Sequence, residues 1–197
     1  NVTSVTSTLF PKEVGKWRVY TPSEQAFEEG EFYVSVTTVL DIIANEHLDG
    51  WKIDNTREFI EKKLETTARV GTDIHSMIEA DFEGAKNSDP TLAKVYENWD
   101  EIKTKYSITS DKREQIVHSM NHGFAGRYDN IGLVKGKRSV QDIKSGWYNI
   151  KAGYQLAGYR AALIEMGEET EDLGMVCIHL HRDGVKTTLS YKTAIWT

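Results

Sequence analysis

Residues 126–144 carry the pattern that most constrains the fold of this chain. Two stretches with the residue types of β-strands, 126–132 and 139–144, flank Lys135-Gly136-Lys137, a sequence typical of a tight hairpin turn. If these strands are antiparallel neighbours, Asp129 on the first lies close to Asp142 on the second. Strand alternation in Asp142-Ile143-Lys144 puts both charged side chains on one side and Ile143 in the core. The stretch therefore predicts two carboxylates and an amine gathered at one place on a sheet.

The part of the chain before this hairpin is predicted to be mainly helical. Helical periodicity begins near Thr56, and Gly71 is a candidate break between two helices. Asp89-Pro90 is typical of a helix start and predicts a helix that runs to Tyr106. Residues 32–40 fit a strand, and equally a helix from Val39 capped by Ser35 or Thr37. Residues 1–30 carry one short strand pattern, at 17–20.

Strand patterns dominate after residue 110. Residues 114–119, 126–132 and 139–144 predict a three-stranded meander, and a helix is expected over 150–166, closed by Gly167. A last hairpin is predicted for 174–181 and 185–192, with its first strand half-exposed. We expect one α/β (α+β mixed) domain over 1–197, comprising an extension (1–34), a mainly helical part (35–110) and a sheet core (111–197).

Composition narrows the classes of function. At 197 residues the chain can bury one proper core, and no apolar run approaches the roughly 20 residues needed to span a bilayer, so no membrane partner is expected. No secretory signal is visible. The single cysteine, Cys177, excludes a disulfide framework and a cysteine-ligated zinc or iron–sulfur centre within one chain, which favours a reducing compartment. A net charge of −6 argues weakly against nucleic acid as the partner, although catalytic carboxylates add to such a balance.

Asp129, Asp142 and Lys144 have the residue types that metal-assisted phosphodiester hydrolysis needs. Carboxylate oxygens suit a hard divalent cation, and an amine stabilises the charge that develops on the phosphate. The simpler interpretations are a turn residue at Asp129 and a solvated Asp–Lys pair. His75 adds an imidazole on a helix, with Glu79 one turn further on the same face, and the simpler interpretation is a surface histidine.

Gln155 and Tyr159 lie one turn apart on the helix predicted after Lys144. They belong to an amphipathic helix that packs on the sheet. They also have the residue types to orient a phosphate or to support Lys144 at the mouth of a site. The two interpretations are compatible.

Four motifs, in this order, resemble those of the PD-(D/E)XK nuclease superfamily: Gly71-Thr72-Asp73-Ile74-His75, residues 123–129 (GFAGRYD), Asp142-Ile143-Lys144 and Gln155-x-x-x-Tyr159. The RecB-like branch, which includes phage exonucleases and the mitochondrial genome maintenance exonuclease, is the most similar group. Residues 35–40 also resemble an N-terminal motif of these exonucleases, so the resemblance spans roughly residues 35–192. It implies a restriction-endonuclease-like core, in which helices flank a mixed central sheet and an N-terminal helical layer precedes it.

The resemblance also implies roles for individual residues. Ligands of Mg²⁺ or Mn²⁺ would be His75, Asp129, Asp142 and the backbone carbonyl of Ile143. Lys144 would be the catalytic lysine, supported by Gln155 and Tyr159. Glu114 stands where some relatives carry an additional acidic group, and we include it as a further candidate ligand. Several relatives hold an iron–sulfur cluster with four cysteines, which this chain with Cys177 alone does not have.

The implied activity is that of a metal-dependent DNA exonuclease without sequence specificity, acting on single strands or DNA ends in replication, recombination or repair. Affinity is expected from phosphate contacts and from stacking on unpaired bases. The candidate residues for these contacts are Arg69, Arg127, Trp147, Tyr148, Lys151 and Arg160. We expect a cytoplasmic protein of a bacterial or phage-infected cell, or a protein of the mitochondrial matrix or nucleoid in a eukaryote.

Three alternatives stay open. A structure-specific endonuclease would use the same chemistry, and a catalytically silent nuclease fold would act only as a DNA- or protein-binding module. A zinc protein would use His179 and His181, which share one face of a predicted strand. Strand alternation already explains that pair of histidines without a metal.

Overall fold

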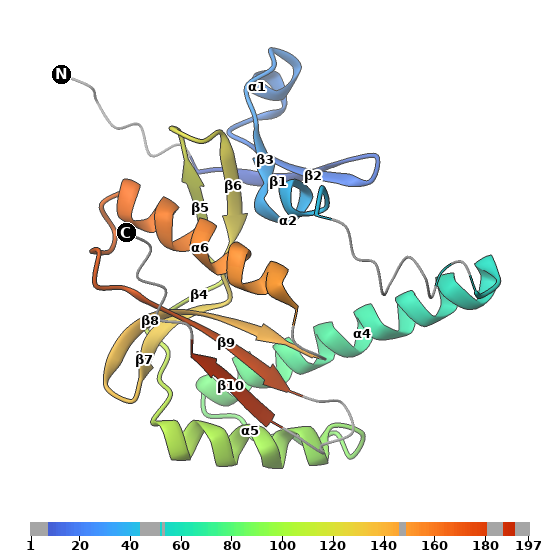
Figure 1. The fold of residues 1–197 in the computed structure, drawn as a ribbon, viewed down its shortest axis with the longest axis vertical. Coiled ribbons are helices and arrows are strands. Elements are labelled where there is room, and N and C mark those ends of the chain that lie inside the picture. Colours follow the sequence, from blue (N-terminus) through green and yellow to red (C-terminus); the bar gives the residue numbers. More distant parts are fainter. Residues whose placement is uncertain (1–7, 44–51, 53, 146–148, 181–186, 192–197) are drawn as a thin grey trace.

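The chain forms two mixed five-stranded sheets, sheet A and sheet B, together with five helices in the part that is described (Figure 1). The structure is a computed structural model that describes residues 8–43, 52, 54–145, 149–180 and 187–191. The mixed α/β class predicted from the sequence is confirmed, but the strands divide between two sheets where a single central sheet was expected. Among these residues, no helix has the length and apolar character needed to cross a membrane.

Sheet A has the strand order β1-β2-β3-β6-β5. Its strands are β1 (Phe10–Val14), β2 (Trp17–Thr21), β3 (Tyr33–Ser35), β6 (Phe124–Arg127) and β5 (Ile116–Ser119), and a short helix, α1 (Glu24–Glu28), separates β2 from β3. Neighbouring strands are antiparallel except for β3 and β6. The strand expected at 17–20 is confirmed, and through β1 to β3 the predicted N-terminal extension forms three of the five strands of a sheet.

Sheet B has the strand order β10-β9-β8-β7-β4. Its strands are β10 (Thr187–Tyr191), β9 (Gly174–Leu180), β8 (Lys137–Lys144), β7 (Asn130–Val134) and β4 (Lys112–Arg113), and β8 and β9 are its parallel pair. Between β7 and β8 the chain turns at Lys135 and Gly136, whose φ angles are 51° and 74°. Two successive positive φ angles match the twist of a two-residue hairpin, so the predicted turn is confirmed.

The predicted meander is wrong in one respect, because the strand expected over 126–132 is divided between the two sheets. β6 ends at Arg127 and β7 begins at Asn130, and the partner strand is broken in the same way between β4 and β5. The two-stranded ribbon thus bends where it passes from sheet B to sheet A. At the bend Glu114 has a φ of 50°, rare for a residue with a side chain, and its amide donates to the carbonyl of Asp129 at 3.2 Å. The fully buried Tyr128 anchors this corner in the core.

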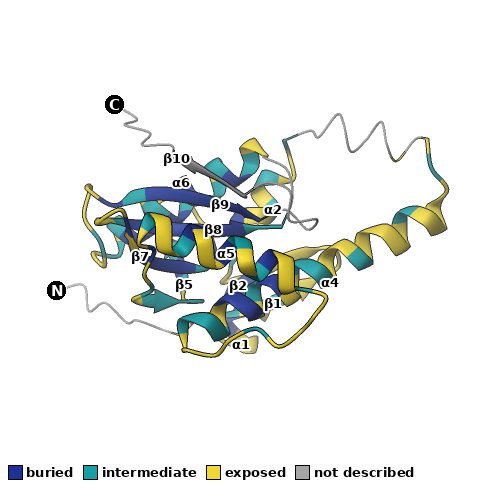
Figure 2. Ribbon diagram, turned by 90° about the horizontal axis from the view of Figure 1, so that it is seen from below, coloured by how far each residue is buried: buried dark blue, intermediate teal, exposed yellow. Residues whose placement is uncertain are grey.

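Helices cover both faces of sheet B. On one face α6 (Ile150–Glu165) packs Ala152, Leu156 and Leu163 over strand residues such as Val140 and Cys177. The other face is covered by α4 (Arg57–Phe82) and α5 (Ala93–Tyr106), which pack against Ile143, Val176 and Ile178 of the sheet. The helix side chains buried there are Ile74, Ile78, Val95, Trp99 and Ile102. β9 is consequently buried on both faces, and the expectation of a half-exposed strand is wrong. The first half of α4 is largely exposed and projects from the body of the protein (Figure 2).

Two predicted helix boundaries are wrong. Gly71 does not break α4, which is continuous over 26 residues. The glycine instead permits close packing, since a Cβ there would lie 3.3 Å from Ser145 Oγ. Asp89 does not cap α5: its carboxylate accepts from the amide and hydroxyl of Thr91 in a preceding turn, and α5 begins at Ala93. The Asp89 side chain therefore accepts the kind of hydrogen bonds expected of a cap, but these bonds stabilise a turn before α5 and not the start of the helix.

Other boundaries follow the sequence more closely. α4 begins after its N-cap Thr56, and α6 begins after Asn149 and ends before Gly167, whose φ is 72°. Residues 32–40 combine both alternatives, since β3 ends at Ser35 and a short helix, α2 (Val36–Leu40), follows at once.

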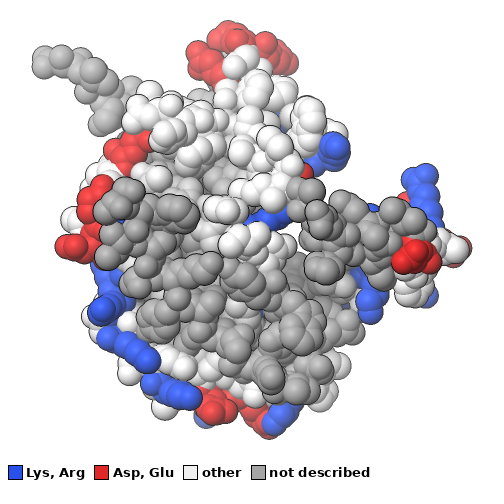
Figure 3. All heavy atoms as spheres, in the orientation of Figure 1, with Lys and Arg blue, Asp and Glu red and all other residues white. Residues whose placement is uncertain are grey.

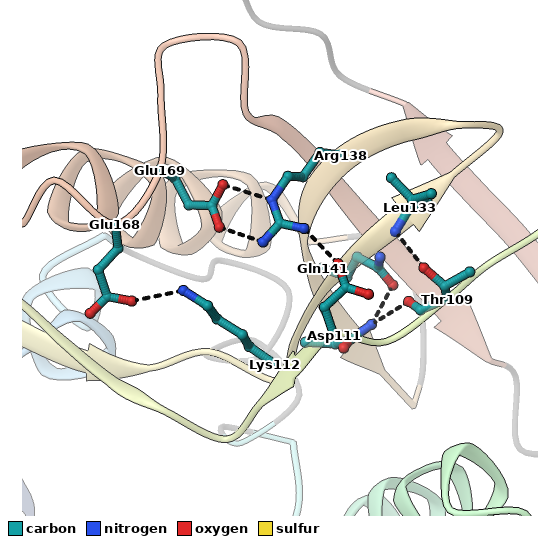
Figure 4. A network of polar contacts seen from close by, with 9 residues as sticks. Thr109, Asp111, Lys112, Leu133, Arg138, Gln141, Glu168 and Glu169 are labelled. Carbon is teal, nitrogen blue, oxygen red and sulfur yellow. Dashed lines mark hydrogen bonds and ion pairs between the residues drawn. The ribbon is translucent and has the colours of Figure 1, made fainter.

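A polar network fixes the β7–β8 hairpin in place (Figure 4). The guanidinium of Arg138 donates two hydrogen bonds to Glu169, at 2.8 and 2.7 Å, and a third to Asp111 at 2.6 Å. On the hairpin itself, the amide of Asn130 donates to Gln141 at 2.9 Å and to the carbonyl of Thr109 at 3.0 Å. Asn130 pairs with Gln141 in the ladder, so these bonds hold the register that sets Asp129 opposite Asp142.

Candidate metal centre

Three potential metal ligands meet at the corner between the two sheets. Glu114 and Asp129 lie at the bend of the ribbon, and His75 faces them from α4. One ligand atom from each residue lies within 4.8 Å of the other two. Such a set of two carboxylates and one imidazole offers mainly oxygen ligands of the kind that Mg²⁺ and Mn²⁺ take.

Asp129 is the most constrained of the three. Its Oδ2 atom accepts a hydrogen bond of 2.7 Å from the backbone amide of Ile143 and lies 3.7 Å from Nδ1 of His75. Burial and, after it, the nearby Asp142 raise the pKa of Asp129 to about 7, against opposing effects of His75 and Lys144. A carboxyl group in this position is stabilised as an anion when a cation binds beside it.

His75 is oriented by the end of β8. Its Nε2 atom lies 2.9 Å from the carbonyl oxygen of Ile143, and because a carbonyl only accepts, Nε2 carries the proton. In a neutral ring, Nδ1 then presents its lone pair towards Asp129. Histidines that bind metals commonly donate their other N–H to a carbonyl in this way. The expected place of the Ile143 carbonyl among the ligands stays a prediction, since here it accepts from His75.

Asp142 and Lys144 form an ion pair beside this cluster, in which the carboxylate is fully buried and the lysine side chain is 37% exposed. Both carboxylate oxygens of the fully buried Asp142 lie within hydrogen-bond distance of Lys144 Nζ, at 3.0 and 2.9 Å. Burial disfavours the charged amine, but Asp142 and Asp129 outweigh it and raise the pKa of Lys144, so the side chain stays an ammonium. The ligand cluster thus contains Glu114, the additional candidate, while the ligand role expected of Asp142 stays a prediction.

Gln155 and Tyr159 point from α6 into the same region. Gln155 Nε2 donates to the hydroxyl of Tyr159 at 2.7 Å. The Tyr159 ring packs on Gly126 so closely that a Cβ there would lie 2.4 Å from Cε1. Burial is the main cause that raises the pKa of Tyr159, so the hydroxyl keeps its proton and remains a donor. Tyr159 and Gln155 therefore belong to a helix that packs on the sheet and also line the candidate site, so both interpretations of this pair hold together.

The cluster opens into a cleft of about 590 Å³ between α4 and sheet A. Its walls include His75, Glu79, Glu114, Asp129, Gln155 and Tyr159, and also Arg18, Tyr20, Ser35, Thr37 and Arg127. A second hollow of about 400 Å³ shares Thr37 and Gln155 with the cleft and is lined by Lys144 and Lys151. The ammonium of Lys144 is thus reached from solvent beside the cluster.

The residues predicted to contact DNA do not gather at one place. Arg127 lines the cleft and forms a 2.8 Å ion pair with Glu114, and Arg69 is exposed on α4 outside the lining. Arg160 bonds the carbonyl of Leu173, at the end of sheet B remote from Lys144, and there it holds the loop before β9. Trp147 and Tyr148 lie outside the described residues. Of the proposed zinc pair, His179 is buried in β9 and His181 lies outside the described residues.

Sequence reasoning missed Arg18 and Tyr20, which line the cleft from β2. The signal available was weak: the two residues are two apart in a predicted strand, and so on one face of it. The sequence carries no signal that places β2 beside the cleft.

No protein-family model matches the chain, and no curated protein matches it. The geometry of the cleft and the motif resemblance are therefore the two grounds for assigning a function.

Proposed function

We propose that this protein is a metal-dependent deoxyribonuclease that hydrolyses phosphodiester bonds without sequence specificity and acts as an exonuclease on single strands or DNA ends. The observation that carries the proposal is the cluster of His75, Glu114 and Asp129, within 4.8 Å of one another in a cleft. The half-buried Asp142–Lys144 pair next to it supplies an ammonium where charge would develop on a phosphate.

The residues present fit a divalent cation. His75 offers Nδ1 with its lone pair, and Glu114 and Asp129 offer carboxylate oxygens in a partly enclosed site. The raised pKa of Asp129 reflects negative charge that is buried without sufficient compensation, which a cation provides. His75, Glu114 and Asp129 would hold the ion, which when bound would supply Lewis-acid activation of a phosphate oxygen and lower the pKa of a bound water.

The chain's own residues account for the other requirements of the reaction. Lys144 stays protonated, so it acts as a fixed positive charge towards the phosphate and not as a general base. Asp142 holds that ammonium in place at 2.9 Å. Gln155 and Tyr159 present an amide and a hydroxyl on the cleft wall, where each can hydrogen-bond a phosphate oxygen.

The proposal is tested by incubating the purified protein with end-labelled single-stranded DNA, end-labelled duplex and closed circular DNA, in Mg²⁺, Mn²⁺ or EDTA. We expect metal-dependent loss of the linear substrates, which EDTA abolishes, and no cleavage of the closed circle. Lys144→Met should retain metal binding and lose most of the rate, because its role lies in the transition state.

Other outcomes separate the alternatives. Equal cleavage of the closed circle would replace the exonuclease with an endonuclease of the same chemistry. DNA binding without cleavage in either metal would reject the enzyme and favour a binding module. Asp100→Asn, an exposed change on α5, serves as the control for preparation and for contaminating nucleases.

A further inference from the structure

The wall of the cleft formed by sheet A carries two guanidinium groups and a phenol. Arg18 and Tyr20 lie two residues apart on β2 and so project from the same face, and Arg127 ends β6. All three line the cleft that contains the His75, Glu114 and Asp129 cluster. This wall is distinct from the metal ligands and from Lys144.

The short β3 brings these side chains together. β3 lies between β2 and β6, and it ends at Ser35, where the chain turns into α2. Arg18 adjoins α2, since its backbone amide donates to Thr38 Oγ1 at 3.3 Å. On the other side of β3, Ser35 pairs with Ala125, which lies two residues before Arg127. Arg18 and Arg127 therefore flank the end of β3, with backbones about 12 Å apart, two strand spacings across the sheet and two residues along it.

Both arginines interact electrostatically with the hydroxyl of the buried Tyr20, in keeping with the cleft that all three residues line. Burial raises the pKa of Tyr20, while the positive charges of Arg18 and then Arg127 oppose that effect. The net pKa is raised, so Tyr20 keeps its proton and offers a hydrogen bond between the two cations.

The two guanidinium groups are available to an incoming anion. Arg18 pairs with Glu13 at 2.7 Å, and the two side chains are 48% and 60% exposed. Arg127 pairs with Glu114, and its own side chain is 54% exposed. Ion pairs this exposed are weak and exchange readily, and an arginine fork matches phosphate oxygens in a way that lysine does not.

The charge of the cleft favours an anion once a cation is bound. Its lining contains Arg18 and Arg127 against Glu79, Glu114 and Asp129, a formal balance of −1 that a divalent ion changes to +1. Much of the negative surface charge lies elsewhere, where exposed glutamates gather around α1 at the far end of sheet A (Figure 3). The acidic composition of the chain is therefore compatible with an anionic ligand in this cleft.

We infer that Arg18, Tyr20 and Arg127 form a phosphate-binding subsite for a single DNA strand. The subsite holds the backbone phosphate that neighbours the one bound at His75, Glu114 and Asp129. The inference rests on the proposed function for the identity of the ligand. Through its ion pair with Glu114, Arg127 also orients one of the metal ligands, and it links strand binding to metal binding.

The experiment measures binding of a fluorescently labelled thymidine oligonucleotide by anisotropy over a series of salt concentrations, in Ca²⁺, which supplies the divalent charge that the cleft needs. The wild type is compared with Arg18→Ala/Arg127→Ala and with Tyr20→Phe. The control Lys94→Ala/Lys105→Ala removes the same charge from exposed positions on α5. Circular dichroism melting curves establish that each variant folds.

We expect the double arginine variant to bind at least about tenfold more weakly, and its slope of log K against log salt to shrink by about 0.7 to 1.4. Tyr20→Phe should weaken binding with an unchanged slope, and the α5 control should bind as the wild type does. Wild-type affinity and slope in the folded arginine variant would overturn the inference, as would an equal loss in the control or no binding by the wild type.

This measurement separates the subsite from the proposed catalysis, because gel analysis after each titration establishes that the bound strand is intact. A protein that binds the strand through Arg18 and Arg127 but never cleaves it supports the subsite and rejects the nuclease. A protein that cleaves DNA with the same KM in the wild type and the double arginine variant supports the nuclease and rejects the subsite. If both hold, KM for the strand rises in the double variant.

Discussion

The backbone amide of Ile143 donates a 2.7 Å hydrogen bond to Oδ2 of Asp129. This bond joins the bend of the ribbon, where Asp129 lies, to β8 between Asp142 and Lys144. The carbonyl of the same residue accepts from Nε2 of His75 at 2.9 Å. One peptide segment of β8 therefore orients both Asp129 and His75, and the next side chain along it is the ammonium of Lys144.

Loss of the Lys144 ammonium should destabilise the fold. Lys144→Met leaves the fully buried Asp142 carboxylate without its cation. We expect a loss of about 1–3 kcal/mol in the free energy of unfolding, less than for a fully buried pair because the Lys144 side chain is 37% exposed. Lys144→Met/Asp142→Asn buries no unpaired charge, so it should recover most of that stability and still not cleave DNA. Urea denaturation at pH 7 measures both effects. A single variant as stable as the wild type would contradict the buried pair.

Gly126→Ala should disturb Tyr159. The new Cβ would lie 2.4 Å from Cε1 of a ring that is itself buried, so the ring must move, and we expect a loss of about 1–3 kcal/mol in stability. Gly153→Ala on α6 is the matched control, because a Cβ there meets nothing within 4 Å and alanine favours the helix by about 1 kcal/mol. Thermal melts of both variants test the packing, and equal melting temperatures would refute it.

Asp81 should make stability depend on pH. The carboxylate accepts from Tyr96, Trp99 and Lys103 of α5 at 2.9, 2.7 and 2.6 Å. Burial alone raises the pKa of Asp81, but these three hydrogen bonds outweigh it and lower the pKa below its ordinary value. The stabilisation is therefore present above the unfolded pKa of about 4, and it is lost as pH falls through the lower folded pKa.

We accordingly expect Asp81→Asn to be less stable than the wild type by about 1–3 kcal/mol at pH 7, with the difference shrinking below about pH 4. Urea denaturation at pH 7, 5, 3 and 2 measures it, and Asp100→Asn on the exposed side of α5 is the control. A difference that stays constant down to pH 2 would show that charge on Asp81 has no part in joining α4 to α5.

Features determined by short-range chemistry were predictable from the sequence. The β7–β8 hairpin follows from the conformational freedom of Lys135-Gly136, and the limits of α6 follow from the Asn149 cap and Gly167. The shared face of Asp142 and Lys144 follows from strand alternation alone. In each case the information lies within a few residues.

Features determined by tertiary packing were not predictable in this way. The division of residues 126–132 between two sheets depends on the burial of Tyr128 and on the bend at Glu114. No local sequence pattern predicts the positive φ angle of Glu114. The same bend brings Glu114 next to His75 and Asp129, and the end of β3 brings Arg18 to the cleft. β9 shows the same limit, since only the packing of helices on both faces reveals its complete burial.

The central claim is that His75, Glu114 and Asp129 hold a divalent cation, and titration of Mn²⁺ followed by electron paramagnetic resonance tests it most directly. We predict saturable binding by the wild type and by Asp100→Asn. Asp129→Asn keeps an oxygen that accepts from Ile143 but loses the charge, and its affinity should fall at least about 10–100-fold, as should that of Glu114→Gln. Absence of binding by the wild type, or equal binding by folded Asp129→Asn, would contradict the account.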